Sequence, residues 1–221
     1  MHIPDGWVDL PTSAAAGVVA VAGTTVAARR AGRALRDRAT TLPAVVAAYV
    51  LVAQLLVLPV GFGTSAHLVG TGLAALLVGP AVAIVCVAAV VVVQALVLAD
   101  GGVTALGLNL INDGLVPALV TWGVFVALRP WVRRAPLAGG LAAGVGSLAA
   151  AGAATLAFVV GGTDSVPASA VAASIGGAHI VLAVLEAGLT AAILATVLRL
   201  RPDLVRAVRA ERVPVTAGAD R

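Results

Sequence analysis

The chain contains no lysine, a single cysteine and few charged residues of any kind. Only 11% of its 221 residues are charged, whereas a typical soluble domain has about 25%. Aromatic residues make up 3% and hydrophobic residues 61% of the chain. The scarcity of charge excludes an ordinary soluble domain. The lone Cys86 lies in an apolar run, so no disulfide can form within the chain and a place in the core is expected.

Several catalytic motifs are also missing from the sequence. It has no His-Glu-x-x-His metal motif, no Gly-x-Ser-x-Gly nucleophile elbow and no Gly-x-x-x-x-Gly-Lys phosphate loop. We therefore expect a protein that is not an enzyme and does not hydrolyse ATP by itself. The net charge of +4 does not indicate nucleic-acid binding, because the arginines flank apolar runs and the sequence predicts no basic, aromatic-interleaved surface on which bases could stack.

What the chain does have is a series of apolar runs long enough to cross a lipid bilayer. Their Ala, Val, Leu and Gly content lacks the alternation of a membrane barrel, which predicts an all-α, multi-pass bundle in the cell membrane. We expect one membrane domain over residues 1–200 and a cytoplasmic basic tail over 201–221. The expected spans are Leu10–Ala28, Leu42–Val60, Leu68–Leu98, Leu110–Leu128, Leu137–Gly161 and Ala168–Leu198.

The arginines predict the topology. They fall in three groups, with five in Arg29–Arg38, three in Arg129–Arg134 and six in Arg199–Arg221. The positive-inside rule places all three in the cytoplasm, so an even number of crossings must separate successive groups. Leu68–Leu98 must then cross twice, with a short first half and a break at Gly79–Pro80. The result is about seven transmembrane helices, with the N-terminus outside and the C-terminus cytoplasmic.

On this topology the outer side carries acidic residues and no arginine. A mouth with that charge attracts cations, although ordinary loop polarity explains the same residues. The acidic residues expected there are Asp5, Asp9, Asp100 and Asp164.

The first two residues, Met1 and His2, form a pattern suited to a transition metal. The terminal amine, the amide nitrogen of His2 and its imidazole chelate one ion through a five-membered and a six-membered ring. No basic leader precedes the apolar stretch, so we expect no signal peptide. Met1 is expected to survive processing, because His is a large second residue. One further nitrogen would complete a square-planar set suited to Ni(II), Cu(II) or low-spin Co(II).

The two other histidines are candidates for different roles. His67 is expected at the outer end of the third helix, on the side of His2, where it is the natural fourth nitrogen donor. The alternative is a capping or interfacial residue. His179 and Glu186 lie seven residues apart on one helix face. Ionisable residues within a membrane indicate a functional site, but packing by hydrogen bonds to a neighbouring helix is the expected role here.

Polar residues follow the glycine-rich stretch 100–107. Asn109, Asn112 and Asp113 cluster there, and Asp100 begins the stretch. Asp100, Asn109 and Asn112 are candidates for orienting a ligating imidazole. The alternative, and the default, is that the cluster caps the helix that follows.

At these residues the chain resembles the CbiM/NikM family of cobalt- and nickel-specific substrate-binding subunits of energy-coupling-factor (ECF) transporters. The opening Met-His-Ile-Pro-Asp-Gly-Trp is the most specific match, and the others follow in the family's order over nearly the whole chain. They are His67–Gly70 with Gly79–Pro80, Ala99–Asn109, and His179 with Glu186–Gly188.

The resemblance implies a seven-helix bundle that captures Co(II) or Ni(II) at the outer face through Met1, His2 and His67. It implies ATP-driven import with a transmembrane coupling subunit, two cytoplasmic ABC ATPases and a small accessory membrane subunit. The metal is the substrate, no organic cofactor is expected, and cobalt would feed cobalamin synthesis. The main alternative is an autonomous ion-coupled metal carrier with His179 and Glu186 as a proton relay. An intramembrane hydrolase with Glu186 as its base ranks last. The sequence does not decide between cobalt and nickel.

Overall fold

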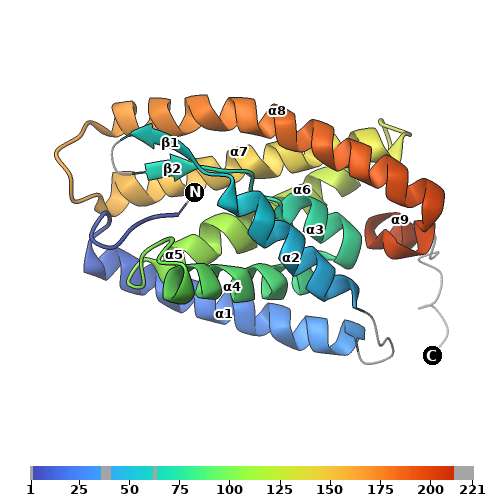
Figure 1. Cartoon of the computed structure of the whole chain (residues 1–221), viewed down its shortest axis with the longest axis horizontal. Helices are drawn as coiled ribbons and strands as arrows, with labels where there is room; N and C mark the ends of the chain where they lie inside the picture. Colours follow the sequence, from blue (N-terminus) through green and yellow to red (C-terminus); the bar gives the residue numbers. More distant parts are fainter. Residues whose placement is uncertain (1, 36–40, 62–63, 212–221) are drawn as a thin grey trace.

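The computed structural model describes residues 2–35, 41–61 and 64–211, which form an elongated helix bundle (Figure 1). Five helical stretches in this part of the chain are long and apolar enough to cross a membrane. Leu106–Leu128 is one continuous stretch made of α5 (Leu106–Asn109), the π-helix η1 (Leu110–Leu115) and α6 (Val116–Leu128). The other four are α1 (Leu10–Leu35), α4 (Pro80–Val97), α7 (Ala135–Gly161) and α8 (Ala168–Leu200).

Shorter elements lie between and after these helices. Helix α2 (Leu42–Leu55) leads to an antiparallel hairpin of β1 (Leu58–Gly61) and β2 (Thr64–Ala66). The hairpin is followed by α3 (Thr71–Val78), and the chain passes after α8 through a 3-10 turn, η2 (Pro202–Leu204), to α9 (Arg206–Glu211). In Figure 1 the hairpin lies beside α8, near the N-terminus.

The break predicted at Gly79–Pro80 is confirmed. Gly79 has φ of 87°, a value that favours glycine, and α4 begins at Pro80, where the missing N–H costs no helical hydrogen bond. The eight residues of α3 extend about 12 Å at a rise of 1.5 Å per residue. The first half of this region is therefore short, as expected, and α3 alone is too short to cross a bilayer.

The predicted span Leu42–Val60 is wrong at its C-terminal end, after Leu55. Helix α2 ends at Leu55, and Leu58 pairs with Ala66 in the hairpin. Pro59 explains the change, because proline cannot donate the backbone hydrogen bond that a continuing helix needs. The prediction treated the whole apolar run as one helix, although a strand begins within its last residues.

The beginning of the expected tail packs against the bundle. Val205 and Ala207 are 1% and 2% exposed and belong to a core cluster with Leu73 and Leu76 of α3. The membrane domain expected to end at residue 200 is therefore continued by a short packed segment. Residues 212–221 of the expected tail lie outside the described part of the chain.

The longest two helices, α7 and α8, pack at small residues. A Cβ atom added to Gly140 would lie 2.4 Å from the backbone oxygen of Ala187 and 2.9 Å from the Cβ of Ala191. Such distances are too short for any side chain, and backbone atoms of a packed helix cannot move aside cheaply. Gly140 in the glycine-rich sequence of α7 thus serves helix packing inside this chain.

Gly140→Ala is expected to destabilise the protein by about 1–3 kcal/mol, because the added methyl group forces α7 and α8 apart. Gly152→Ala on the same helix is the matched control, since nothing lies within 4 Å of its added Cβ. That variant is expected to be neutral or stabilising by up to about 1 kcal/mol through helix propensity. Thermal unfolding in detergent compares the two, and equal melting temperatures would contradict the packing role of Gly140.

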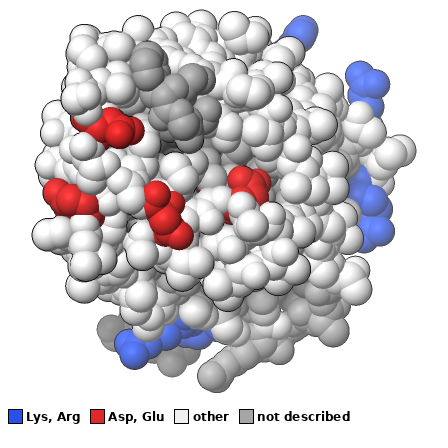
Figure 2. All heavy atoms as spheres, turned by 60° about the vertical axis from the view of Figure 1, so that its left-hand side comes forward, with Lys and Arg blue, Asp and Glu red and all other residues white. Residues whose placement is uncertain are grey.

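The two ends of the bundle differ in charge. Figure 2 looks onto the end that holds the start of α1, where acidic side chains gather and arginines appear only at the margins. The backbone of residues 7–9 joins the end of α7 here, through a Val8–Gly162 bridge and a hydrogen bond from Asp9 N to Gly161 O. Because α1, α6 and α8 run away from this end, their arginine-bearing termini lie at the opposite end. This separation agrees with the shared side predicted for the arginine groups.

Candidate metal centre

The N-terminal segment enters the acidic end of the bundle and is held there by its backbone. Ile3 N donates to Oδ1 of Asn109 at 2.7 Å, and Asn109 Nδ2 donates to Ile3 O at 3.1 Å. The N–H of Gly102 donates to the same Ile3 oxygen at 2.9 Å. His2 and Ile3 are consequently buried, at 4% and 1% exposure. One asparagine side chain thus fixes the position of the residue next to His2.

Two glycines in the loop before α5 make room for this segment. Gly101 has φ of 96°, and a Cβ on Gly102 would lie 2.4 Å from Asp5 N. The loop is further tied to the segment by Asp5, whose Oδ1 accepts from Thr104 N at 2.7 Å and Thr104 Oγ1 at 2.6 Å. The Thr104 hydroxyl holds the pKa of the Asp5 carboxyl below its usual value.

The rings of His2 and His67 meet in the interior. Their centroids are 4.7 Å apart and their planes are tilted by 33°. Nδ1 of His67 lies 3.1 Å from Leu68 O, and Nδ1 of His2 lies 3.1 Å from Oδ1 of Asp100. A proton on each Nδ1 leaves the lone pair on each Nε2, the arrangement typical of metal-binding histidines. His67 Nε2 is buried and has no hydrogen-bond partner among the described residues.

Asp113 is the third member of this cluster. Its Oδ2 atom lies 3.9 Å from Nε2 of His2, and one ligand atom from each of His2, His67 and Asp113 fits within a mutual separation of 4.8 Å. All three residues are buried. Asp113 sits in η1, a π-helical turn, and such turns occur frequently at functional sites.

Asp100 contacts His2 from the loop side. Its contact with the His2 ring lowers the pKa of the Asp100 carboxyl, so it is ionised at neutral pH. This contact agrees with the orienting role expected for Asp100. It has a consequence for the predicted terminal chelate, because the six-membered ring uses Nδ1 of His2, and that atom faces Asp100 here. The imidazole must turn for the chelate to form.

Glu186 acts on the segment that carries His67. Its carboxylate oxygens accept from Gly70 N at 2.9 Å and Val69 N at 3.2 Å, just before α3 begins. His179 lies on the same face of α8 and is fully buried, with Nδ1 2.9 Å from Ile175 O of its own helix. These contacts fit the packing role expected for both residues. Glu186 in addition holds the loop that carries His67, a candidate ligand.

Other sequence expectations fare differently. His67 is 0% exposed and lies four residues before α3 begins, beside His2, so it is buried rather than at an exposed helix end. Its position on the outer side of the membrane stays a prediction. The prediction that the polar cluster of Asn109, Asn112 and Asp113 caps the helix that follows is wrong, because α5, η1 and α6 show no side-chain cap hydrogen bond. Asn109 orients the Ile3 backbone rather than an imidazole. Asn112 is 1% exposed and its Nδ2 has no partner among the described residues. Met1, the expected amine donor, lies outside the described residues.

Asn109→Ala is expected to lower metal affinity about 10- to 100-fold, the range for removing a group that supports a ligand. The variant loses both hydrogen bonds to Ile3, so His2 is no longer held against His67. Isothermal titration with Ni(II) measures the loss, and hydrogen exchange at Ile3 should rise with it. Asn112→Ala is the control at a buried asparagine of the same turn. If both variants bind alike, the Asn109 clamp does not support the site.

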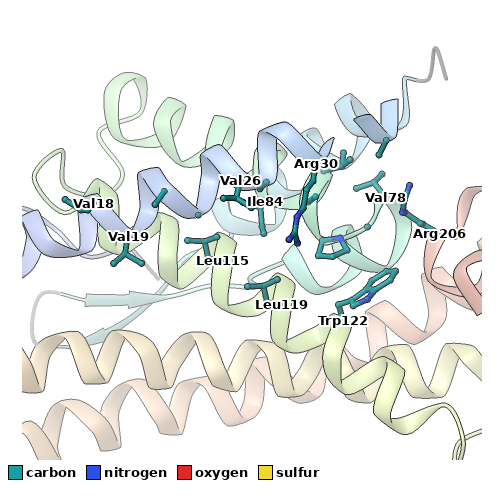
Figure 3. A pocket seen from close by; sticks show the side chains of 18 residues that line it. Val18, Val19, Val26, Arg30, Val78, Ile84, Leu115, Leu119, Trp122 and Arg206 are labelled. Atoms are coloured by element: carbon teal, nitrogen blue, oxygen red, sulfur yellow. The ribbon is translucent and has the colours of Figure 1, made fainter. Parts of the chain in front are cut away.

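A large pocket lies elsewhere in the bundle. It has a volume of about 790 Å³ and opens between α1, α6 and the α3–α4 junction. Figure 3 shows apolar side chains such as Leu115 and Leu119 along it, with Arg30 and Arg206 toward the end away from Val18. None of His2, His67 or Asp113 lines this pocket. The candidate metal centre is a closed cluster of side chains rather than an open cavity.

The fold and this cluster define a class: a multi-pass membrane protein with a buried cluster of side chains at one end that could hold a metal ion. Within it, the chain belongs to the CbiM family, whose model, described as the cobalt uptake substrate-specific transmembrane region, matches residues 2–204. The protein is thus a transmembrane component for cobalt or nickel uptake, and its place in a membrane, predicted from the apolar runs, is confirmed.

Individual relatives agree with this assignment. A Haloquadratum walsbyi protein named for metal transport is 35% identical over 212 residues, which cover 93% of each chain. A fused nickel transport protein NikMN of Archaeoglobus fulgidus is 34% identical over 93% of this chain and 68% of its own length. The cobalt transport protein CbiM of Clostridioides difficile is 30% identical over 67% of this chain and 60% of its own.

Solved structures show the same fold. A crystal structure of a transition metal transporter superposes with a TM-score of 0.83 and 25% identity, covering 90% of this chain and 93% of that one. A truncated transition metal transporter gives a TM-score of 0.80 and 26% identity, with 90% and 99% of the two chains covered.

Proposed function

We propose that this protein is the substrate-binding subunit of an ECF-type ABC transporter and that it captures Co(II) or Ni(II) at the outer face of the membrane. The ligands are the Met1 amine, the His2 amide nitrogen and imidazole, and the His67 imidazole. The observation that carries the proposal is the convergence of the buried His2 and His67 rings at the acidic end of the bundle. The chain crosses the membrane about seven times, with the N-terminus outside.

The charge distribution supports this orientation. Arginine-bearing helix ends lie opposite the candidate metal centre, and the positive-inside rule assigns such ends to the cytoplasm. The acidic end then faces outward, where its carboxylates concentrate a divalent cation. Cobalt imported by such a subunit would supply cobalamin synthesis.

Partners follow from the fused relatives. The NikMN proteins of Archaeoglobus fulgidus and Rhodobacter capsulatus combine this region with a second part in one chain. We propose that the present chain associates with an N-type accessory membrane subunit. A transmembrane coupling subunit and two cytoplasmic ABC ATPases complete the importer and supply the energy for transport.

The competing function is an autonomous ion-coupled metal carrier. In the structure, Glu186 accepts two backbone hydrogen bonds rather than facing an open path, which supports a structural role over a proton relay. Proteoliposomes that contain only this chain distinguish the two. We expect binding of Co(II) or Ni(II) without uptake, and uptake only when the coupling subunit, ATPases and ATP are present. Uptake driven by a proton gradient in this chain alone would overturn the proposal.

A further inference from the structure

We propose that Asp113 is a direct ligand of the transported ion, which gives the site an anionic oxygen donor in addition to its nitrogen ligands. This inference rests on the proposed metal-binding function and extends its ligand set. Asp113 is not needed for the terminal chelate. Its position beside His2 and His67, its burial and its charge point to metal ligation.

The first argument is distance. Oδ2 of Asp113 and Nε2 of His2 are 3.9 Å apart, which is too long for a hydrogen bond. Because the terminal chelate uses Nδ1 of His2, this contact places the carboxylate beside the imidazole that must turn, and it is not itself a distance between two ligands. Two ligands of one ion, each bonded at about 2.1 Å, are separated by roughly 3–4 Å. His67 completes the group, in which one ligand atom of each residue lies within 4.8 Å of the other two. Small side-chain movements would bring these atoms within bonding distance of one ion.

The second argument is positioning. The Thr71 hydroxyl donates to the backbone oxygen of Asp113, which ties η1 to the start of α3. His67 lies four residues before Thr71, and Glu186 holds the intervening backbone at Val69 and Gly70. Asp113 and His67 are thus set in a fixed relation by contacts that do not depend on an ion. Such support keeps ligands in place before binding.

The third argument is charge. The proposed nitrogen set contains one anionic group, the deprotonated amide of His2, and three neutral donors. A bound dication would leave a net positive charge in a site whose described ligands are 0–4% exposed. Uncompensated charge is costly in a buried environment. Asp100 is ionised beside His2, but its side chain is 27% exposed to solvent. Asp113, at 0% exposure, supplies a negative charge in the buried part of the site.

A fifth donor changes the geometry of the metal, and the change is measurable. Four nitrogens in a plane favour square-planar Ni(II), which is diamagnetic, whereas a fifth ligand makes Ni(II) paramagnetic. We therefore expect the wild-type protein to bind Ni(II) in a paramagnetic, five-coordinate form. Magnetic susceptibility in solution and X-ray absorption on the full chain read the spin state and the coordination number. A planar, diamagnetic wild-type complex would overturn the ligand role of Asp113.

Variants separate ligation from simple support. Asp113→Leu removes the carboxylate and excludes water from its place, so we expect four-coordinate, diamagnetic Ni(II) and an affinity at least about 10-fold lower. Asp113→Asn, nearly isosteric, is expected to weaken binding through loss of the charge. Asp100→Asn is the matched control, because Asp100 also contacts His2 but lies outside the three-residue cluster. Its complex should stay paramagnetic.

The outcomes also separate this inference from the proposed function. Failure of the wild-type protein to bind Ni(II) or Co(II) overturns both. Binding with a planar ion, or an unchanged spin state in Asp113→Leu, overturns only the role of Asp113. The wild-type measurement decides the question even where Asp113→Leu does not fold.

Discussion

One extra residue ahead of Met1 is expected to abolish most metal binding, with a loss of affinity of at least about 100-fold. The extension converts the terminal amine into a peptide nitrogen and destroys the five-membered ring that joins amine to amide. No side chain is removed. The buried position of His2 and Ile3 adds to the effect, because an extension has to leave the interior past the segment held by Asn109. The expected loss exceeds the 10- to 100-fold range for groups that merely support a ligand.

Four proteins at matched expression test this expectation. They carry an uncleaved N-terminal tag, a C-terminal tag, the His2→Ala substitution, or an N-terminal tag that cleaves to leave Met1 first. Titration with Ni(II) should show strong loss in the first and third and normal binding in the second and fourth. Full binding by the uncleaved N-tagged protein would exclude the amine as a ligand and leave His2 as an ordinary donor.

The second large effect is expected at His67. His67→Ala removes the fourth nitrogen donor, so the affinity for Co(II) and Ni(II) should fall about 100-fold or more. His179→Ala removes a ring of the same size that is equally buried but hydrogen-bonded within α8. Because both substitutions leave a cavity, both should lower the melting temperature. Isothermal titration separates them: only His67→Ala should lose metal affinity. Abolished binding in His179→Ala with normal binding in His67→Ala would reverse the assignment.

Much of the fold could be predicted from the sequence, because a helix that spans a membrane requires a long apolar run. Helices α7 and α8 begin and end within two residues of the predicted spans Leu137–Gly161 and Ala168–Leu198. The break at Gly79–Pro80 was predicted from arginine parity and is seen in the backbone. The hairpin after α2 was missed, since its first strand, Leu58–Gly61, continues the apolar run of the helix before it. Hydrophobicity alone does not separate a short strand from a buried helical end.

The site was harder to predict than the fold. The pairing of His2 with His67 was expected, and the structure brings the two rings together. Metal binding through the predicted nitrogens stays a prediction. The clamp between Asn109 and Ile3 was missed, because a backbone contact over 106 residues leaves no local pattern. Gly101 and Gly102 gave the one available signal: adjacent glycines before a helix mark a close approach of another backbone.

The candidate metal centre draws on three stretches that lie far apart in the chain: the N-terminal segment, the loop before α3 and η1. An ion bound there would act as a thermodynamic crosslink between them, because the unfolded chain keeps only the chelate of its first two residues and binds the ion more weakly. At an ion concentration 100 times the Kd, folding gains at most about 2.7 kcal/mol, and less to the extent that the unfolded chain binds the ion. Metal loading and the rigidity of this end of the bundle are therefore expected to be linked, with the metal-loaded protein the stiffer one. A partner that binds this end would contact a more flexible surface before metal capture and a more rigid surface after it.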